Sequence, residues 1–155
     1  RTNLTIQQLK TTLLVDTATN AVLDIHVTTT RKHDTQIAPQ VVKRNAASIK
    51  VLTGDKGYDD QKLRHLARDH DIRPLIKHRE FTSLHKAWNA RLDTDLYHQR
   101  NMNETVNVII KQKFGAFVRS RLWWKQFREL VIKCVVHNVE RSLALSHEEY
   151  DCPRV

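Results

Sequence analysis

Between residues 10 and 76, short runs rich in β-branched residues alternate with longer amphipathic stretches. The runs 10–15 and 21–28 flank a polar segment, 16–20, and this pattern predicts a hairpin. The spacing then predicts a helix over 35–45 with Asp34 as its N-cap, a strand over 49–53, a helix over 61–70 and a strand over 72–76. The order ββαβαβ predicts an α/β domain with a sheet flanked by helices.

The sequence of the second half of the chain predicts mainly helices. Segment 78–95 is polar and irregular, and we expect an inserted loop there with Trp88 as its one large anchor. Met102, Val106 and Ile110 share one face of a helix predicted over 96–114, and charged residues occupy the opposite face. Domain 1–145 is therefore expected to end in helices, and the tail 146–155 is expected to fray.

A second long helix is predicted over 122–145. Its apolar positions recur at helical spacing and form one stripe, which we expect to face the core. The stripe consists of Phe127, Leu130, Val131, Cys134, Val135 and Val139. Cys134 on this stripe is interpreted as a buried small hydrophobe rather than as half of a zinc site with His137.

The composition favours a phosphate-rich partner. The formal net charge is +9 and the pI is about 9.8, which suits DNA. The apolar runs are far shorter than the ~18 residues of a membrane span, so no membrane partner is expected. Two cysteines without a pairing pattern, and the lack of a signal-like start, favour a reducing cytosol.

Two acidic residues each have two interpretations. Asp55 follows a predicted strand and precedes Gly57, so it either projects past the carboxyl edge of a sheet or merely shapes a turn. Glu104 has Arg100 four residues earlier on the polar face of its helix, where a solvent-exposed ion pair would explain both. Neither acid alone identifies a function.

Taken together, two stretches resemble the DDE transposases of bacterial and archaeal insertion sequences. The segment Asp55-Lys-Gly-Tyr looks like the family's second catalytic aspartate and the residues that follow it. The segment Tyr97-x2-Arg100-x3-Glu104-x6-Lys111 matches the tyrosine, arginine, glutamate and lysine signature around the third catalytic acid. The similarity runs from the hairpin to about Leu145, and Asp34 before the first helix is a lesser agreement.

The resemblance implies a ribonuclease-H-like fold that cuts and joins DNA at transposon ends. Asp55 and Glu104 would be catalytic and would ligate two Mg²⁺ or Mn²⁺ ions, for which hard carboxylate oxygens are suitable. Tyr97, Arg100 and Lys111 would contact DNA. The expected partners are transposon ends and target DNA, with a homodimer of the full-length enzyme, in a prokaryotic cytoplasm at the nucleoid.

The chain departs from the family pattern at the first catalytic aspartate. That residue lies on the first of three strands before the first helix, and this chain shows two such strands. Asp16 ends a strand, but a short polar residue at a hairpin turn needs no catalytic role. We therefore expect 10–15 to be the family's second strand and the first aspartate to lie upstream of Arg1, so that the chain is a truncated catalytic domain. Asp24 is expected to be an exposed strand residue.

Weaker candidates lie near the start of the last helix. A basic cluster of Arg119, Arg121, Lys125 and Arg128 could follow DNA, and one of Trp123 and Trp124 is expected to face the core. Two rival functions remain open at this point. One is a non-catalytic DNA-binding remnant of a transposase, and the other is a nuclease of the same superfold.

Overall fold

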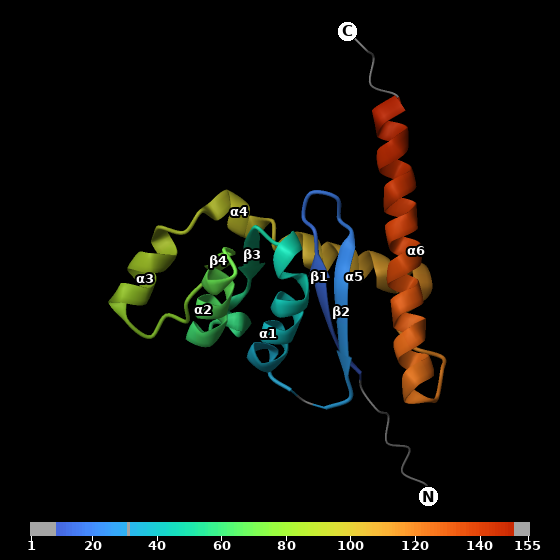
Figure 1. The fold of residues 1–155 in the computed structure, drawn as a ribbon, viewed down its shortest axis with the longest axis horizontal. Helices are drawn as coiled ribbons and strands as arrows, with labels where there is room; N and C mark the ends of the chain where they lie inside the picture. Colours follow the sequence, from blue (N-terminus) through green and yellow to red (C-terminus); the bar gives the residue numbers. More distant parts are fainter. Residues whose placement is uncertain (1–8, 31, 151–155) are drawn as a thin grey trace, which may run out of the picture. The chain divides into compact units, whose positions relative to one another are not determined.

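The computed structural model describes residues 9–30 and 32–150 (Figure 1). These residues divide into two compact units. The first comprises residues 9–12 and 25–98, and the second comprises residues 13–24 and 99–150. Strands β1 (Lys10–Val15) and β2 (Val22–Thr28) form the predicted hairpin, and each unit contains one part of it.

The first unit contains a parallel strand pair with helices. Its elements are α1 (Asp34–Asn45), the 3₁₀ turn η1 (Ala46–Ser48), β3 (Val51–Gly54), the 3₁₀ turn η2 (Lys56–Tyr58), α2 (Gln61–Asp69) and β4 (Arg73–Ile76). Strands β3 and β4 pair in parallel with Val51 opposite Arg73 and Gly54 opposite Ile76. Helix α2 is the crossover that parallel strands require. The predicted order ββαβαβ is confirmed.

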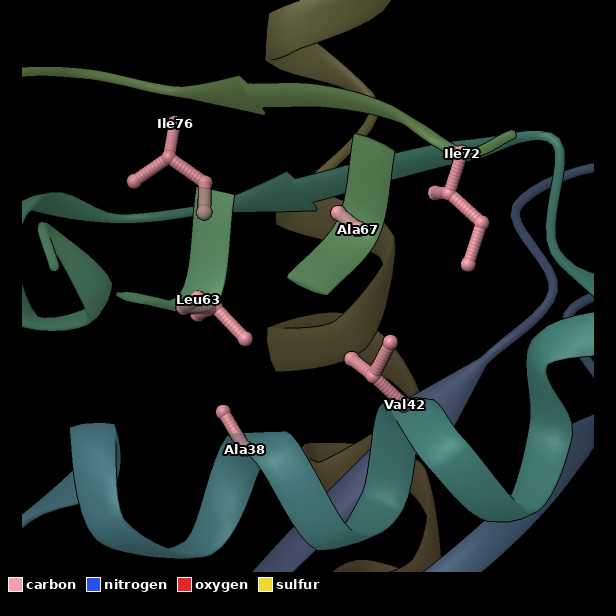
Figure 2. Packing of buried hydrophobic residues seen from close by; sticks show 6 residues of the cluster. All are labelled: Ala38, Val42, Leu63, Ala67, Ile72 and Ile76. Carbon is pink, nitrogen blue, oxygen red and sulfur yellow. The ribbon is translucent and has the colours of Figure 1, made fainter. Parts of the chain in front are cut away.

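An apolar cluster holds this unit together. Side chains from α1, α2 and the β4 region point toward one another in Figure 2 and are almost fully buried. The cluster consists of Ala38, Val42, Leu63, Ala67, Ile72 and Ile76. Full burial of a Leu or Ile side chain contributes about 1.5–3 kcal/mol, so the apolar spacing of the two helices fixes their packing against the strand pair.

Segment 78–95 is not the irregular loop that its composition predicts. It contains α3 (Ser83–Ala90), and α4 (Thr94–His98) begins within it. The Thr82 hydroxyl accepts a hydrogen bond from the His85 amide and caps α3. The Trp88 ring lies 5.0 Å from the His78 ring and 5.7 Å from the His85 ring, centroid to centroid. The prediction was wrong because this helix is anchored by ring contacts rather than by an apolar stripe.

The second unit is built from α5 (Asn101–Phe114), α6 (Trp123–Tyr150) and the turn end of the hairpin. The helix predicted over 96–114 is broken into α4 and α5 at residues 99–100. Val106 and Ile110 of α5 are buried. The Asn138 amide of α6 bonds both the N–H and the C=O of Val22 at 2.8 Å, as a neighbouring strand would. Helix α6 continues to Tyr150, beyond its predicted end at 145.

The inward face of α6 differs from the predicted stripe. Cys134 is buried as expected, and burial raises the pKa of its thiol. Phe127, Val135 and Val139 are exposed, whereas Lys133 and His137 are buried. The polar side chains turn inward because they bond backbone groups of the hairpin and of the segment before α6. Trp123 and Trp124 are both exposed, so the expectation that one faces the core was wrong.

The chain is a mixed α/β protein, as predicted. Among the described residues, its strands form two separate pairs, β1–β2 and β3–β4, rather than one mixed sheet. The described residues contain no further strand that could join the two pairs into one sheet. A search of the same residues found no helix long and apolar enough to cross a membrane.

Candidate active site

Asp55 directly follows β3, at the carboxyl end of the parallel pair. It caps the turn η2, and its Oδ1 accepts a hydrogen bond from the Gly57 amide at 2.7 Å. The residue is exposed, and among the described residues this amide is the one hydrogen-bond partner of the carboxylate. Asp55 therefore shapes its turn and also presents a carboxylate to solvent at the carboxyl end of β3.

Gly57 is needed for this arrangement because of space. A Cβ atom added at Gly57 would lie 2.8 Å from Oδ1 of Asp55. Any larger residue would therefore push the carboxylate away from the amide that orients it. The glycine in the Asp-Lys-Gly sequence thus serves the position of the Asp55 side chain and does not supply an unusual backbone conformation.

A second carboxylate lies near the same turn. Asp34 begins α1, with His33 rather than Asp34 at the N-cap position, and its Oδ1 lies 2.7 Å from Nζ of Lys10. Burial raises the pKa of Tyr58 to about 12, and the negative charges of Asp34 and Asp55 contribute to the shift. Both acids therefore act on the half-buried phenol of Tyr58. Asp34, however, is paired with Lys10 in this structure.

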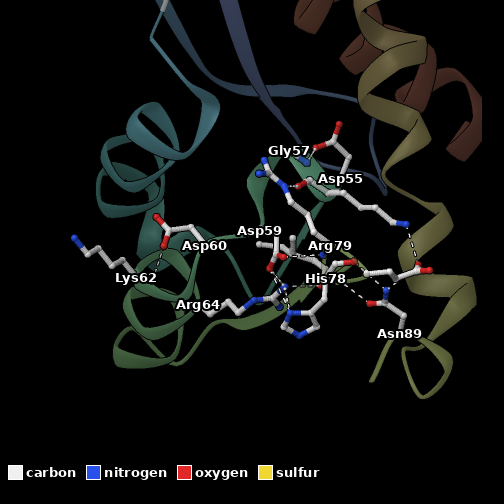
Figure 3. Close-up of polar contacts among 12 residues, drawn as sticks. Asp55, Gly57, Asp59, Asp60, Lys62, Arg64, His78, Arg79 and Asn89 are labelled. Atoms are coloured by element: carbon white, nitrogen blue, oxygen red, sulfur yellow. Dashed lines mark hydrogen bonds and ion pairs between the residues drawn. The ribbon is translucent and has the colours of Figure 1, made fainter. Parts of the chain in front are cut away.

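The turn after Asp55 is tied to the segment that follows β4 (Figure 3). Nη2 of Arg64 donates to Oδ1 of Asp59 at 2.7 Å and to the Ile76 carbonyl at 3.0 Å. The Arg79 amide donates to Oδ2 of Asp59 at 2.7 Å. His78 Nδ1 lies 3.3 Å from Oδ1 of Asp59. One carboxylate thus joins α2 to the carboxyl end of β4.

The charges of this network are set by burial and by the guanidinium. Burial alone would raise the pKa of Asp59, but the hydrogen bonds from Arg64 and from the Arg79 amide hold it below its usual value. Burial and the nearby Arg64 charge lower the pKa of His78, although Asp59 opposes the shift. His78 is therefore neutral at pH 7, and the ion pair is Asp59 with Arg64.

Two further contacts fasten the Asp55 turn from outside. Nε of Arg79 donates to the Lys56 carbonyl at 3.1 Å, and Nζ of Lys56 lies 2.9 Å from Oε1 of Glu80. The Asn89 amide bonds both backbone groups of His78 and so connects α3 to the same segment. The turn that carries Asp55 is thus bound on one side by β4 and the residues after it.

Tyr97 lies in the first unit and is 4% exposed. Nζ of Lys77 stands 4.5 Å from the centroid of its ring. Such burial favours a packing role for the phenol at the carboxyl end of β4, where α4 contacts both β3 and β4. The expected hydrogen bond or stacking contact with DNA has no support from this placement.

Glu104 and Arg100 lie in the second unit. Nη1 of Arg100 is 3.3 Å from Oε1 of Glu104, and the Glu104 side chain is 74% exposed. Lys111, two turns further along α5, is exposed as well. The ion pair is the exposed i,i+4 contact that the spacing predicts, and such pairs contribute only about 0.3–0.5 kcal/mol. The Glu104 carboxylate therefore remains accessible to an external cation.

Asp16 is used by the hairpin turn. Its carboxylate accepts hydrogen bonds from the Thr19 hydroxyl at 2.5 Å and from the amides of Ala18 and Thr19, each at 3.3 Å. The Thr19 hydroxyl is the main cause that lowers the pKa of Asp16. These contacts agree with the structural interpretation of Asp16 and argue against a catalytic one.

The basic cluster before and within α6 is exposed. Nζ of Lys125 stands 5.2 Å, and the guanidinium carbon of Arg128 5.1 Å, from the Trp124 ring centroid. Arg119 and Arg121 precede the helix and are exposed. The cluster thus presents cations to solvent, two of them resting on one aromatic ring.

The carboxylates of Asp55 and Glu104 have the oxygen chemistry that Mg²⁺ and Mn²⁺ prefer. Each is exposed in its own unit and bears only one polar contact among the residues described. A search of those residues found no group of three or more His, Cys, Asp or Glu side chains that could hold a metal ion.

A family model described as Transposase DDE domain matches residues 2–139. The chain belongs to the transposase DDE domain family. Searches of curated proteins and of solved structures returned no match. Membership implies a role in DNA transposition, and therefore DNA binding and cleavage, and members of this family generally use divalent metal ions.

The sequence interpretation did not single out Asp59 or Arg64, which together with His78 form the most buried polar network of the DDE domain's first unit. Arg64 gave a signal in the sequence. It lies one residue after Leu63 and three before Ala67, on the apolar side of α2. A charged residue at such a position predicts a buried partner, but only the fold identifies that partner as Asp59.

Proposed function

We propose that residues 1–145 form the ribonuclease-H-like catalytic domain of an insertion-sequence transposase, which cuts DNA at transposon ends and joins it to a target. Asp55 and Glu104 act as two of its metal-binding carboxylates. The observation that carries the proposal is the family match over 2–139 together with an exposed, oriented carboxylate at the end of a parallel strand pair.

Asp55 is suited to its role by its position in the fold and by the fixed orientation of its carboxylate. Ligands in α/β folds bind beyond the carboxyl ends of parallel strands, where Asp55 stands. The Gly57 amide fixes one carboxylate oxygen, and the contacts of Arg79 and Lys56 hold the turn itself. A preorganised ligand loses less conformational freedom when a cation binds.

Glu104 is suited by exposure and by its neighbours. Arg100 lies beside its carboxylate, and Lys111 follows on the same helix. The three would bring a metal ligand and two cations to a scissile phosphate and its neighbours, where Arg can contact phosphate oxygens through two N–H groups. Tyr97 is assigned a positioning role, because its ring is buried beneath Lys77.

Divalent ions, when bound, would activate the attacking hydroxyl or water and stabilise the leaving oxygen. Asp55 and Glu104 would hold them with hard carboxylate oxygens. Asp16 is not proposed as the third ligand, because its carboxylate is occupied by the Thr19 hydroxyl and by two amides. Arg119, Arg121 and Lys125 are proposed to follow the DNA backbone away from the reacting phosphate.

The test uses the full transposase that carries this domain, with a supercoiled plasmid, labelled 3′-hydroxyl transposon ends and Mn²⁺. Asp55→Asn and Glu104→Gln should each abolish nicking and strand transfer while DNA affinity is kept, because each removes a negative charge beside phosphate. Asp69→Asn, an exposed acid on α2, is the matched control and should leave both reactions unchanged.

Each rival function corresponds to a different result. Binding of DNA by the wild-type enzyme without any cleavage would identify a non-catalytic remnant. Cleavage without joining of the 3′-hydroxyl ends would identify a nuclease. Full activity of Asp55→Asn or Glu104→Gln would exclude that residue as a metal ligand.

A further inference from the structure

Helix α6 presents two different faces. One face makes polar contacts with the turn end of the hairpin: Asn138 bonds both backbone groups of Val22, and Nε of Arg141 donates to the Thr19 carbonyl at 3.1 Å. The opposite face carries exposed apolar side chains. We call these residues the α6 stripe, which consists of Ile132, Val135, Val136, Val139 and Leu143.

The α6 stripe is a continuous apolar surface with polar limits. Its side chains are 39–60% exposed, and their exposed area, on the order of 500 Å², matches the largest apolar patches of soluble proteins, which are often functional. Arg128 precedes the stripe and Ser146 follows it on the same side of α6, and both are exposed. Glu140, beside the stripe, is paired with Lys113 at 2.6 Å. The stripe is therefore one bounded patch rather than a scatter of apolar residues.

The spacing of the stripe is that of a helix–helix seam. Four of its residues follow one another at intervals of four, three and four: Ile132, Val136, Val139 and Leu143. Alternating intervals of four and three are the heptad spacing that keeps two helices in contact along one seam. Aliphatic side chains offer neither charge nor hydrogen bonds to a phosphate, so the stripe suits another apolar helix and not the DNA backbone.

A second copy of this chain supplies a helix that matches the seam. Because every copy carries the same stripe, two copies can bring these residues together about a two-fold axis, which is the commonest symmetry of homodimers. The stripes of two copies would bury about 1,000 Å² in total, which is the lower limit for a specific interface. The sequence resemblance implies a homodimer but assigns no surface to it, and α6 provides such a surface.

The charges at one end of the stripe decide the direction of the pairing. Lys125 lies seven residues before Ile132 and therefore on the same side of α6, and Arg128 lies beside it over the Trp124 ring. A parallel arrangement would set these cations against the same cations of the second copy, and like charges in contact oppose association. An antiparallel arrangement separates them by the length of the stripe.

We propose that two copies of this chain associate through the α6 stripe in an antiparallel, two-fold contact. Val136 of each copy then faces Val139 of the other copy, and Ile132 faces Leu143. The contact uses neither the carboxylates nor the cations of the proposed catalytic function. It therefore goes beyond that function and is tested separately from it.

The test measures self-association of the full transposase by sedimentation equilibrium, without DNA. The wild type should form dimers. Val136→Glu should raise the Kd of the dimer about 100-fold, because the two-fold axis places two charges in the apolar seam and each costs at least about tenfold in affinity. Leu84→Glu is the matched control, since it makes the same kind of change at an exposed residue of α3, and it should leave the Kd unchanged.

A second experiment tests the antiparallel register. Val139→Lys alone should dissociate the dimer as Val136→Glu does. A mixture of the two variants should form a heterodimer, because the antiparallel register brings the new glutamate opposite the new lysine and keeps one contact between Val136 and Val139. A parallel register would place each new charge opposite a valine. The circular dichroism spectra should stay unchanged, since both positions are exposed.

Three results would overturn the inference. The first is a wild-type transposase that stays monomeric. If the thiol of Val139→Cys in that monomer also resists a water-soluble reagent, another segment of the same chain covers the stripe. The second is a dimer whose Kd is the same for Val136→Glu and the wild type, which would place the interface elsewhere. The third is the absence of a heterodimer in the mixture, which would exclude the antiparallel contact.

Discussion

Replacing Asp59 by Ala should destabilise the first unit more than replacing any exposed acid. The change removes the ion pair with Arg64 and the hydrogen bond from the Arg79 amide. The Arg64 side chain is 5% exposed and the Asp59 side chain 14%. The guanidinium would thus stay buried with the Ile76 carbonyl as an acceptor but without its counter-charge.

The magnitude follows from these contacts. Removing one partner of a buried ion pair costs about 3–5 kcal/mol, and the remaining Ile76 contact favours the lower end. The lost hydrogen bond from the Arg79 amide adds about 1 kcal/mol. The expected loss in the free energy of unfolding is therefore about 4 kcal/mol. With a urea m-value of about 2 kcal/mol/M, the unfolding midpoint should fall by about 2 M.

The assay is urea unfolding followed by circular dichroism and by tryptophan fluorescence. Trp88 reports locally, because its ring lies against that of His78. Arg64→Met alone should cost about 2 kcal/mol, since the half-buried Asp59 carboxylate keeps the Arg79 amide and can be hydrated. The double variant should cost little more than Arg64→Met, because the uncompensated guanidinium is gone. Asp69→Ala is the control and should change stability by less than about 0.5 kcal/mol.

Two results would refute this reasoning. One is a change below about 0.5 kcal/mol for Asp59→Ala, which would mean that the pair is hydrated in solution. The other is simple additivity of the two single variants, which would mean that Asp59 and Arg64 act independently.

Three further predictions follow from the site. Gly57→Ala should change the free energy of unfolding by less than about 1 kcal/mol, because the added Cβ meets only the end of the Asp55 side chain. The variant should nevertheless weaken Mn²⁺-dependent nicking, because it displaces the Asp55 carboxylate. Unchanged nicking would show that the 2.7 Å hydrogen bond from the Gly57 amide to Asp55 is dispensable. Acidification should destabilise the domain, because folding lowers the pKa of His78 below its usual value of 6.5 and that of Asp59 below 3.8. Each group therefore stabilises the fold at a pH above its usual pKa, and this contribution is lost as the pH falls through the folded-state pKa. Melting temperatures measured from pH 7.5 to 4 should decline less for His78→Gln, and parallel curves would contradict the assignment. Asp16→Ala should lower the free energy of unfolding by about 1 kcal/mol through loss of its turn contacts, while nicking by the full transposase stays at the wild-type level; loss of nicking in a folded variant would make Asp16 catalytic.

Some parts of the site could be predicted because they depend on neighbours in the sequence. The position of Asp55 at a strand end follows from the apolar run before it and the glycine after it. The contact between Arg100 and Glu104 follows from helical spacing. In both cases the interacting groups are at most four residues apart, so local periodicity is sufficient.

Other parts could not be predicted because their partners are distant in the sequence. Asp59 meets the Arg79 amide across 20 positions, and Asn138 meets Val22 across 116. Helix α3 was missed because its anchor, Trp88, packs on histidine rings. The inward face of α6 was misjudged because periodicity assigns apolar residues to the interior. Here, carbonyl groups of the hairpin and of the segment between α5 and α6 require polar partners on that face.

The sequence by itself determined the order of the elements from the hairpin to β4, and a family model matched to residues 2–139 places the chain among transposase DDE domains. Both depend on short-range spacing, which side-chain periodicity and turn chemistry fix directly. Only the tertiary structure decided which charges are buried, which carboxylates are already occupied, and which aromatic ring is exposed. Those properties depend on the removal of water by segments distant in the chain, and burial changes the free energy of every polar group it encloses.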